Sequence, residues 1–300
     1  MALQESSETA PDALSPAQAP GSLTPPGLVP SAVEGTAAGA LFASLNAILV
    51  ISYRDLVKFL RDPSRWFWSF IFPLLFIGIF GETMRANLGA GAGYDFVTFT
   101  FTGVLAMTLF LSTAEGVISL IDDRENDFSQ EMFVSPISRY AIVFGKIAGE
   151  SLVALPQGIA ILIFGFIVGV PISVPQVLGL AMVAVAACLF GGAFGVILMA
   201  SFSSRRAASQ IVPFIMMPQY FLGGVFTPIR VLPWYLDILS RLSPMRYAVD
   251  LTRGVYYAGQ PEYAKVVLEA PIGNLAIMGV MFAVFLAAGT WLFVRRERNR

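Results

Sequence analysis

The sequence predicts an all-α integral membrane protein with six transmembrane helices. Of its 300 residues, 56% are hydrophobic and only 13% are charged, whereas a soluble domain carries about 25% charged residues. Its mean hydropathy is +0.71. The apolar residues also form runs near the ~20 residues that a helix needs to cross a bilayer. Lipid is therefore the main solvent for most of this chain.

The composition excludes several functional classes. A formal net charge of −1 argues against nucleic acid as a partner, because phosphate binding needs clustered basic residues. The chain has no histidine, and its single cysteine, Cys188, lies in an apolar run. Histidine-based zinc sites, histidine bases and intrachain disulfides are thus excluded. We expect no catalytic residue, no metal site and no cofactor bound by this chain.

The first 38 residues predict a disordered tail. They are rich in Ala, Pro, Ser and Gly, lack an apolar period, and include Pro25-Pro26-Gly27. No basic segment followed by an apolar segment and a cleavage site is present, so the tail does not match a signal peptide. We expect it to stay on the protein, on the cytoplasmic side.

Residues 39–65 predict an amphipathic helix that connects the tail to the first span. Basic residues gather near its end, and a long apolar run follows at once, which favours a helix lying in the membrane interface. The alternative is a cytosolic helix packed on the protein's own bundle. The apolar stripe of this helix comprises Leu41, Leu45, Ile48, Leu49, Ser52 and Leu56.

Residues 66–300 form the predicted transmembrane domain, which contains six apolar runs separated by charged or turn-forming residues. Pro73 interrupts the first run, and Pro213 and Pro218 interrupt the fifth. Prolines are tolerated in such helices because neighbouring groups satisfy the freed carbonyls, although they mark kinks. The predicted spans are 66–81, 96–121, 140–170, 174–202, 211–226 and 271–294.

The distribution of basic residues predicts a multi-pass protein of the cell membrane with both termini in the cytoplasm. Cytoplasmic segments of membrane proteins carry an excess of Lys and Arg. With the N-terminus inside, most of the 19 basic residues fall on that side. They are Arg54, Lys58, Arg61, Arg65, Arg124, Arg139, Lys146, Arg205, Arg206, Arg295, Arg296, Arg298 and Arg300.

The inner loop between the second and third spans is long enough to fold. Asn126 or Asp127 can cap a short helix, which must end before Pro136 because the residue ahead of a proline avoids the helical region. This helix would present apolar side chains among charged ones, as a docking element does. The alternative is a solvated, charged turn. The candidate docking residues are Asp123, Arg124, Glu125, Phe128, Met132, Phe133, Ser135 and Pro136.

The outer loop before the last span predicts two short amphipathic helices. Asp237 precedes Arg241 by four residues, the favourable order for a helical ion pair, and Ser243-Pro244 can start the second helix. We predict a re-entrant hairpin, which requires other protein to shield its broken backbone. The alternative is a pair of surface helices capping the bundle. The residues that define the hairpin are Pro228, Pro233, Trp234, Pro244 and Tyr247.

Ionisable residues inside the spans are candidates for function because they are costly in lipid. Glu115 is either a pathway residue or an anchor at the interface. Lys146 and Glu150 lie one helical turn apart, and we expect them to reach the inner interface by snorkelling. Among the aromatic residues, Phe99, Phe101 and Phe110 could line an apolar path, although packing or lipid contact is the simpler role for each.

Three motifs in this order around six spans resemble the ABC type-2 permeases, especially their daunorubicin-resistance branch. The resemblance covers roughly residues 41–298. The motifs are Arg61-Asp62-Pro63; Asp123-Arg124-Glu125 through Ser135-Pro136-Ile137-Ser138-Arg139 and Gly145-Lys146; and Phe226-Thr227-Pro228 through Ser243-Pro244-Met245-Arg246-Tyr247-Ala248-Val249-Asp250 to Arg253.

The resemblance implies a role for each predicted element. The inner loop would be a coupling helix seated in a groove of a nucleotide-binding subunit, residues 39–65 a connecting helix, and the outer hairpin a re-entrant gate. A second permease copy or a paralogue would face this chain. Ser243 stands where the family commonly has asparagine. Asp127 lies near a position often occupied by glycine, which leaves the boundary of the coupling helix open.

The source of energy follows from a missing motif. The sequence has no Gly-x-x-x-x-Gly-Lys-Ser/Thr loop, and its one Gly-Lys pair, Gly145-Lys146, precedes isoleucine. We therefore expect no enzyme activity from this chain alone, with ATP and Mg on a partner ATPase subunit. The expected function is export of a hydrophobic or amphipathic molecule, such as a drug or lipid.

Two alternatives remain at this stage. One is export of a polysaccharide or glycolipid by the same machinery. The other is a self-sufficient ion-coupled carrier, which would need several buried carboxylates or inverted repeats of broken helices. A membrane-embedded enzyme would need a nucleophile with a base or a set of metal ligands, and the sequence offers neither.

Overall fold

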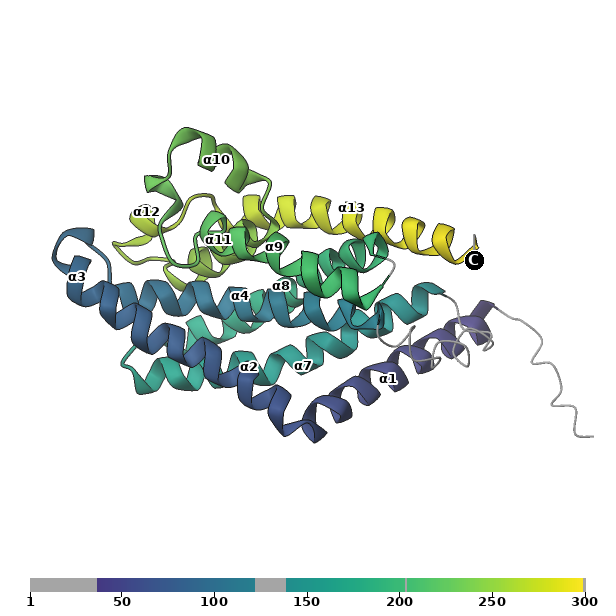
Figure 1. Cartoon of the computed structure of the whole chain (residues 1–300). Helices are drawn as coiled ribbons and strands as arrows, with labels where there is room; N and C mark the ends of the chain where they lie inside the picture. Colours follow the sequence, from purple (N-terminus) through teal and green to yellow (C-terminus); the bar gives the residue numbers. More distant parts are fainter. Residues whose placement is uncertain (1–36, 122–138, 203, 299–300) are drawn as a thin grey trace, which may run out of the picture.

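The computed structural model describes residues 37–121, 139–202 and 204–298, and within these ranges all regular structure is helical. The long helices run side by side as an elongated bundle (Figure 1). The elements are α1 Ala37–Arg61, α2 Pro63–Leu75, the π-helical segment η1 Phe76–Gly81, α3 Glu82–Ala92, α4 Phe96–Ile118, α7 Arg139–Ile167, α8 Val174–Ser201, α9 Arg205–Leu222, the 3-10 turn η2 Ile229–Val231, α10 Trp234–Arg241, α11 Pro244–Tyr256, α12 Tyr263–Val266 and α13 Pro271–Arg298.

Five helical segments of the described chain are long and apolar enough to cross a membrane. They match five of the six predicted spans. The remaining prediction, 211–226, falls on α9, an 18-residue helix that is not among the five. The early turns of α9 carry Arg205, Arg206 and Gln210, which lower its hydropathy. The five segments are Phe67–Asn87, Phe96–Ile118, Tyr140–Ile167, Val174–Ser201 and Tyr263–Phe293.

The first span is longer than predicted. Helical structure continues from Pro63 to Ala92 through η1, although the sequence prediction ended at residue 81. Pro73 has no backbone N–H, so the regular ladder is interrupted and the widened turn of η1 follows directly. Glu82 and Arg85 do not end the helix, because they form an exposed ion pair of 3.4 Å on its surface.

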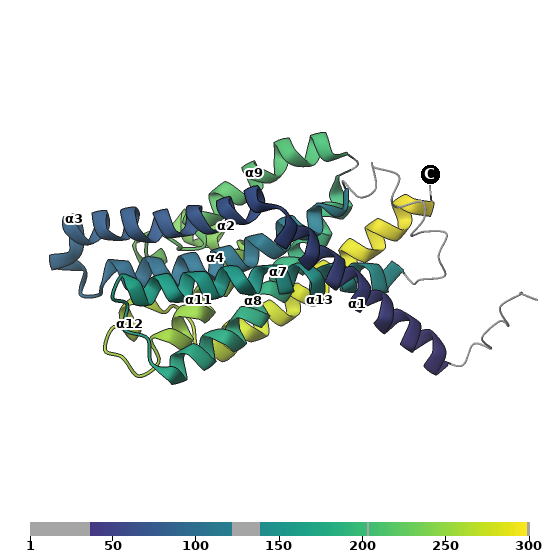
Figure 2. The same ribbon diagram turned by 90° about the horizontal axis from the view of Figure 1, so that it is seen from below.

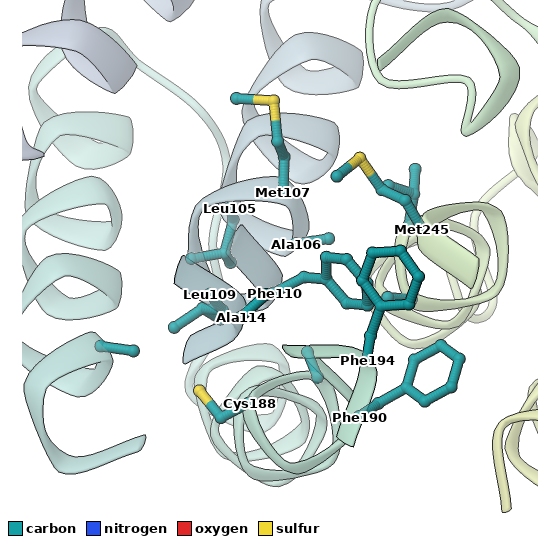
Figure 3. Close-up of a cluster of buried hydrophobic side chains, with 14 of the residues drawn as sticks. Leu105, Ala106, Met107, Leu109, Phe110, Ala114, Cys188, Phe190, Phe194 and Met245 are labelled. Atoms are coloured by element: carbon teal, nitrogen blue, oxygen red, sulfur yellow. The ribbon is translucent and has the colours of Figure 1, made fainter. Parts of the chain in front are cut away.

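Helix α4 is the centre of the bundle. Its side chains from Phe96 to Phe110 are all buried, and it contacts α7, α8, α11 and η1. Figure 3 shows Phe110 beside Phe190 and Phe194 of α8, with ring centroids 5.7 and 5.5 Å apart. Phe99 and Phe101 are likewise fully buried. These aromatic residues therefore belong to the core, as the simpler interpretation expected.

Glycines let α8 approach α4 at backbone distance. A Cβ atom on Gly195 would lie 2.5 Å from the carbonyl oxygen of Ala114, and one on Gly191 would collide with the backbone of Phe110. Helices in lipid associate largely through such close van der Waals packing, because lipid is as apolar as the side chains. Gly191 and Gly195 therefore set the distance between the two helices.

Helix α1 packs on one side of the bundle and bears a second, exposed apolar face. Phe59 is 1% exposed, whereas Leu45 and Leu49 of the predicted stripe are 50% and 66% exposed. The helix ends at Arg61, earlier than the predicted residue 65, because Asp62 precedes Pro63 and leaves the helical conformation. Figure 1 shows α1 and α2 meeting at an elbow there. The contact of α1 with α7 fits the packed interpretation, and the interfacial interpretation stays a prediction.

Replacing Gly195 with leucine should destabilise the protein by at least about 2 kcal/mol, because the added side chain must push α4 and α8 apart. Gly279 of α13 offers the matched control, since nothing lies within 4 Å of its Cβ position. The measurement is the thermal unfolding midpoint in detergent. Equal midpoints for Gly195→Leu and Gly279→Leu would contradict the packing described here.

Candidate functional site

A groove lies where α2, α4, α7 and α9 meet. Its volume is about 380 Å³, within the range of small-molecule sites. Figure 2 shows α2 and α4 running alongside each other over this stretch. We call it the α4 groove. Its walls are Trp68, Ser69, Phe72, Pro73, Met107, Thr108, Leu111, Ser112, Glu115, Gln157 and Tyr220.

The two sides of the α4 groove differ in chemistry. Helices α2 and α9 contribute the aromatic rings of Trp68, Phe72 and Tyr220. The opposite side, on α4 and α7, carries hydroxyl and amide groups. There Gln157 is buried and its Nε2 donates to the Ser112 hydroxyl at 2.9 Å. A molecule with an apolar body and a few polar groups would find partners for both parts.

Glu115 gives the α4 groove its charge. It is the one charged side chain among the lining residues, and it is exposed. Its carboxylate lies on the same face of α4 as Leu111 and Ser112, since residues three and four apart share a helical face. The combination of a carboxylate with aromatic rings favours a positively charged group on a bound molecule.

The segment between α9 and α13 contains two unlike helices, α10 and α11. All residues of α11 from Pro244 to Gly254 are buried, including charged ones. The Asp250 carboxylate accepts hydrogen bonds from the backbone N–H groups of Leu268 and Glu269 at 2.8 and 2.9 Å. It accepts a third from the side-chain amide of Asn274 at 2.7 Å. Asp250 thereby joins α11 to the start of α13.

Arg253 joins α11 to α4. Its guanidinium carbon lies 3.6 Å from the centre of the Phe99 ring, and Nη2 donates to the Phe99 and Val225 carbonyls at 3.4 and 3.3 Å. Gly103 makes room for this arrangement, because its Cβ position is 2.5 Å from the Val225 carbonyl oxygen. Two carbonyl groups and an aromatic face thus stabilise this buried cation, while its Nε–H has no hydrogen-bond partner among the described residues.

Helix α10 is exposed and amphipathic. The Asp237 carboxylate accepts hydrogen bonds from Arg241 at 2.9 Å and from Arg246 of α11 at 3.0 Å. The predicted ion pair with Arg241 is therefore present. The Tyr247 hydroxyl donates to the Arg241 carbonyl at 2.7 Å. These contacts tie α10 to α11 while its apolar side chains face outward. The exposed ones are Trp234, Tyr235, Ile238, Leu239 and Leu242.

The family model described as ABC-2 type transporter matches residues 46–257, which is more than half of the chain. The chain belongs to the ABC-2 type transporter family. It is 24% identical over 259 residues to the "Inner membrane transport permease YadH" of Escherichia coli, covering 84% of this chain and 96% of that protein. The match includes most of α1, all of α4, and helices α10 and α11.

Two further relatives have names that point the same way. The chain is 23% identical over 223 residues to ycf38 of Cyanophora paradoxa, whose name proposes a transport permease; the match covers 72% of this chain and 76% of that protein. It is 26% identical over 142 residues to the "Probable multidrug ABC transporter permease YbhR" of Escherichia coli, over 46% and 38% of the two chains. The chain is therefore the membrane component of a transporter.

The predicted docking residues of this ABC-2 protein, from Asp123 to Pro136, lie outside the described residues. The predicted hairpin residues lie within the described part of the chain and differ in burial. The Trp234 side chain is 76% exposed, whereas Tyr247 is only 8% exposed. Glu115 lines the α4 groove, and its role in a transport path stays a prediction. Within the described ranges, no group of His, Cys, Asp or Glu could hold a metal ion.

The expectation that Lys146 and Glu150 snorkel to the interface was wrong. Both side chains are buried, and the Lys146 ammonium lies 2.8 Å from Glu150 and 3.0 Å from Asp55 of α1. Sequence reasoning missed Asp55, because it followed the apolar stripe of α1 and not the face that contacts α7. The signal was available in Gly145-x-x-x-Gly149 beside these charges, a spacing typical of closely packed membrane helices.

Acid should loosen α10 from α11 in this ABC-2 protein. The hydrogen bonds from Arg241, and then Arg246, hold the pKa of Asp237 below its ordinary value. Because the folded pKa is lowered, the stabilisation that ionised Asp237 gives to α10 docking is complete above the unfolded pKa of about 3.9. This stabilisation is lost as the pH falls through the folded pKa. Docking of α10 should thus be constant from pH 7 to about 4 and weaken below that.

The measurement is the fluorescence of Trp234 during acid titration, with the other three of the four tryptophans replaced by phenylalanine. Asp237→Asn should abolish the acid step, since the amide does not titrate. Persistence of the same step in Asp237→Asn would assign it to another group.

Proposed function

We propose that this chain is the permease subunit of an ATP-binding cassette exporter, which moves a hydrophobic or amphipathic drug-like or lipid-like molecule out of the cell. The observation that carries this proposal is the α4 groove. Its aromatic wall, its hydroxyl and amide wall and the single carboxylate of Glu115 suit a greasy molecule that bears a cationic or polar end. The multidrug transporter named among the relatives supports this class of cargo.

The energy comes from a separate ATPase subunit, which binds ATP and Mg. Support comes from the absence of a phosphate-binding loop in the 300 residues and from membership of the ABC-2 family. The inner loop at 122–138 docks on that subunit through Phe128, Met132 and Phe133. Closure of two ATPase subunits then pushes this loop and shifts the helices between inward and outward openings.

The orientation puts both termini and the inner loop in the cytoplasm of a cell-membrane protein. The start of α1, the end of α4, the start of α7 and the end of α13 lie toward the same end of the bundle (Figure 1). Basic residues Arg205 and Arg295 lie at that end too, consistent with the charge rule. In this layout α9 is the fifth of six spans, and α10 and α11 form the re-entrant hairpin in the outer leaflet.

A second permease copy, or a paralogue, faces the α4 groove and encloses the path. Trp68 and Phe72 on the rim are 64% and 50% exposed, and Glu115 is exposed as well. Apposition of two such grooves would remove these groups from lipid and create a path with a carboxylate on each side. This arrangement would explain why α4 carries the charged residue Glu115 within a membrane span.

The alternatives fit the described residues less well. A carrier that works alone would use buried ionisable groups along its path, yet Lys146 pairs with both Asp55 and Glu150, and none of the three lines the groove. A polysaccharide path would offer many hydroxyl and amide partners, whereas apolar and aromatic side chains make up much of this groove.

The test is to tag the chain, purify it from its native cell in mild detergent, and identify the proteins that accompany it. We expect a stoichiometric ATPase subunit. Replacing Phe128 and Met132 with aspartate should release it, because the docking helix would lose its apolar contact. Replacing the same two residues with leucine keeps the apolar surface of the loop and is the control, which should leave the complex intact. A pure, stable chain without any ATPase would refute the proposal.

A further inference from the structure

A cluster of four charges lies between α1 and α7. The Lys146 ammonium is 3.0 Å from Asp55 and 2.8 Å from Glu150, and Arg54 is 2.8 Å from the other oxygen of Asp55. The side chains of Lys146, Asp55 and Glu150 are 4%, 2% and 1% exposed, whereas that of Arg54 is 21% exposed. Among the described residues, two positive and two negative groups thus meet at this point.

Glycines bring three helices together around this cluster. A Cβ atom on Gly149 of α7 would lie 2.9 Å from the α-carbon of Ser52 in α1, so the two backbones nearly touch. The Ser52 hydroxyl donates to the Gly145 carbonyl at 3.2 Å. On the other side, the Glu150 carboxylate occupies the space that a side chain at Gly116 of α4 would need. The charge cluster therefore fixes α1, α7 and α4 relative to one another.

The charge cluster lies near the ends of α4 and α7 from which the chain continues into the proposed docking loop. Gly116 is close to the end of α4, and Lys146 is two turns into α7, so both flank the loop at 122–138. At its far end α1 meets α2 at the elbow of Asp62 (Figure 1). Helix α2 carries Trp68 and Phe72, which form the aromatic wall of the groove. A displacement of α7 would thus reach that wall through α1.

We infer that the Asp55–Lys146–Glu150 cluster clamps α1 to α7, so that α1 acts as a lever that moves the α2 wall of the groove when the docking loop moves. Buried ion pairs add little to the stability of a protein, since apolar residues of similar size stabilise it equally well. They do select one register: sliding α1 along α7 would leave buried charges unpaired. These residues are positioning residues, and the inference rests on the proposed function.

The first test compares transport with ATP hydrolysis in the complex of this chain and its ATPase. The variant Asp55→Asn/Lys146→Met/Glu150→Gln removes the three buried charges together, so no buried charge is left alone. We expect ATPase binding and hydrolysis within twofold of wild type and a loss of at least tenfold in transport per ATP. Lys265→Met, at an exposed outer lysine, is the control. Unchanged transport per ATP in the triple variant would overturn the inference.

The second test measures the α1–α7 distance with spin labels at Val50→Cys and Ile159→Cys, which replace exposed residues, in a Cys188→Ser background. We expect one narrow distance with and without trapped nucleotide, and a broad distribution in the triple variant. A distance that changes with nucleotide in the otherwise wild-type protein would overturn the inference.

The distance measurement also separates the two proposals. If no ATPase accompanies the chain, the proposed function fails, and the α1–α7 distance can still be measured in the chain alone. A narrow distance that broadens in the triple variant then supports the clamp, and a distance that is equally broad in both proteins overturns it.

Discussion

Close approach of other helices to α4 at glycine residues is the constraint on which the rest of the structure depends. The neighbours of α4 meet it where a side chain is missing: η1 at Gly81, the turn before η2 at Gly103, Glu150 of α7 at Gly116, and α8 at Gly195. In lipid, apolar side chains gain little from burial against each other, so contact area at short range holds helices together. A central helix with many glycine contacts therefore determines the spacing of the whole bundle.

Polar groups occupy the places that these contacts protect. Arg253 reaches two carbonyl groups beside Gly103, and Glu150 reaches Lys146 beside Gly116. The backbone and side-chain partners satisfy charges that would otherwise be costly inside a membrane. One face of α4 borders the groove, and it carries Leu111, Ser112 and Glu115. The groove and the charge clusters thus follow from the same packing.

Much of the fold was predictable because hydropathy depends on local sequence. Five spans, the ion pair of Asp237 with Arg241 and the start of α11 at Pro244 all follow from local patterns. The Gly145-x-x-x-Gly149 spacing indicates a close helix contact beside Lys146, but it does not identify Asp55, 91 positions away, as the partner across that contact. The α4 groove was likewise missed except for Glu115, since its walls come from four separate helices. The end of α2–α3 was misjudged because charged residues can lie on a helix surface without ending it.

The most direct measurement is ATP-driven movement of a fluorescent cationic amphiphile in vesicles that contain the chain and its ATPase. The account predicts that Glu115→Gln lowers this movement about tenfold, the effect of roughly 1.4 kcal/mol, at unchanged expression and ATPase binding. Glu82→Gln, at an exposed carboxylate of α3, should have no effect. Equal transport by Glu115→Gln and wild type would remove Glu115 from the path and contradict the role given to the α4 groove.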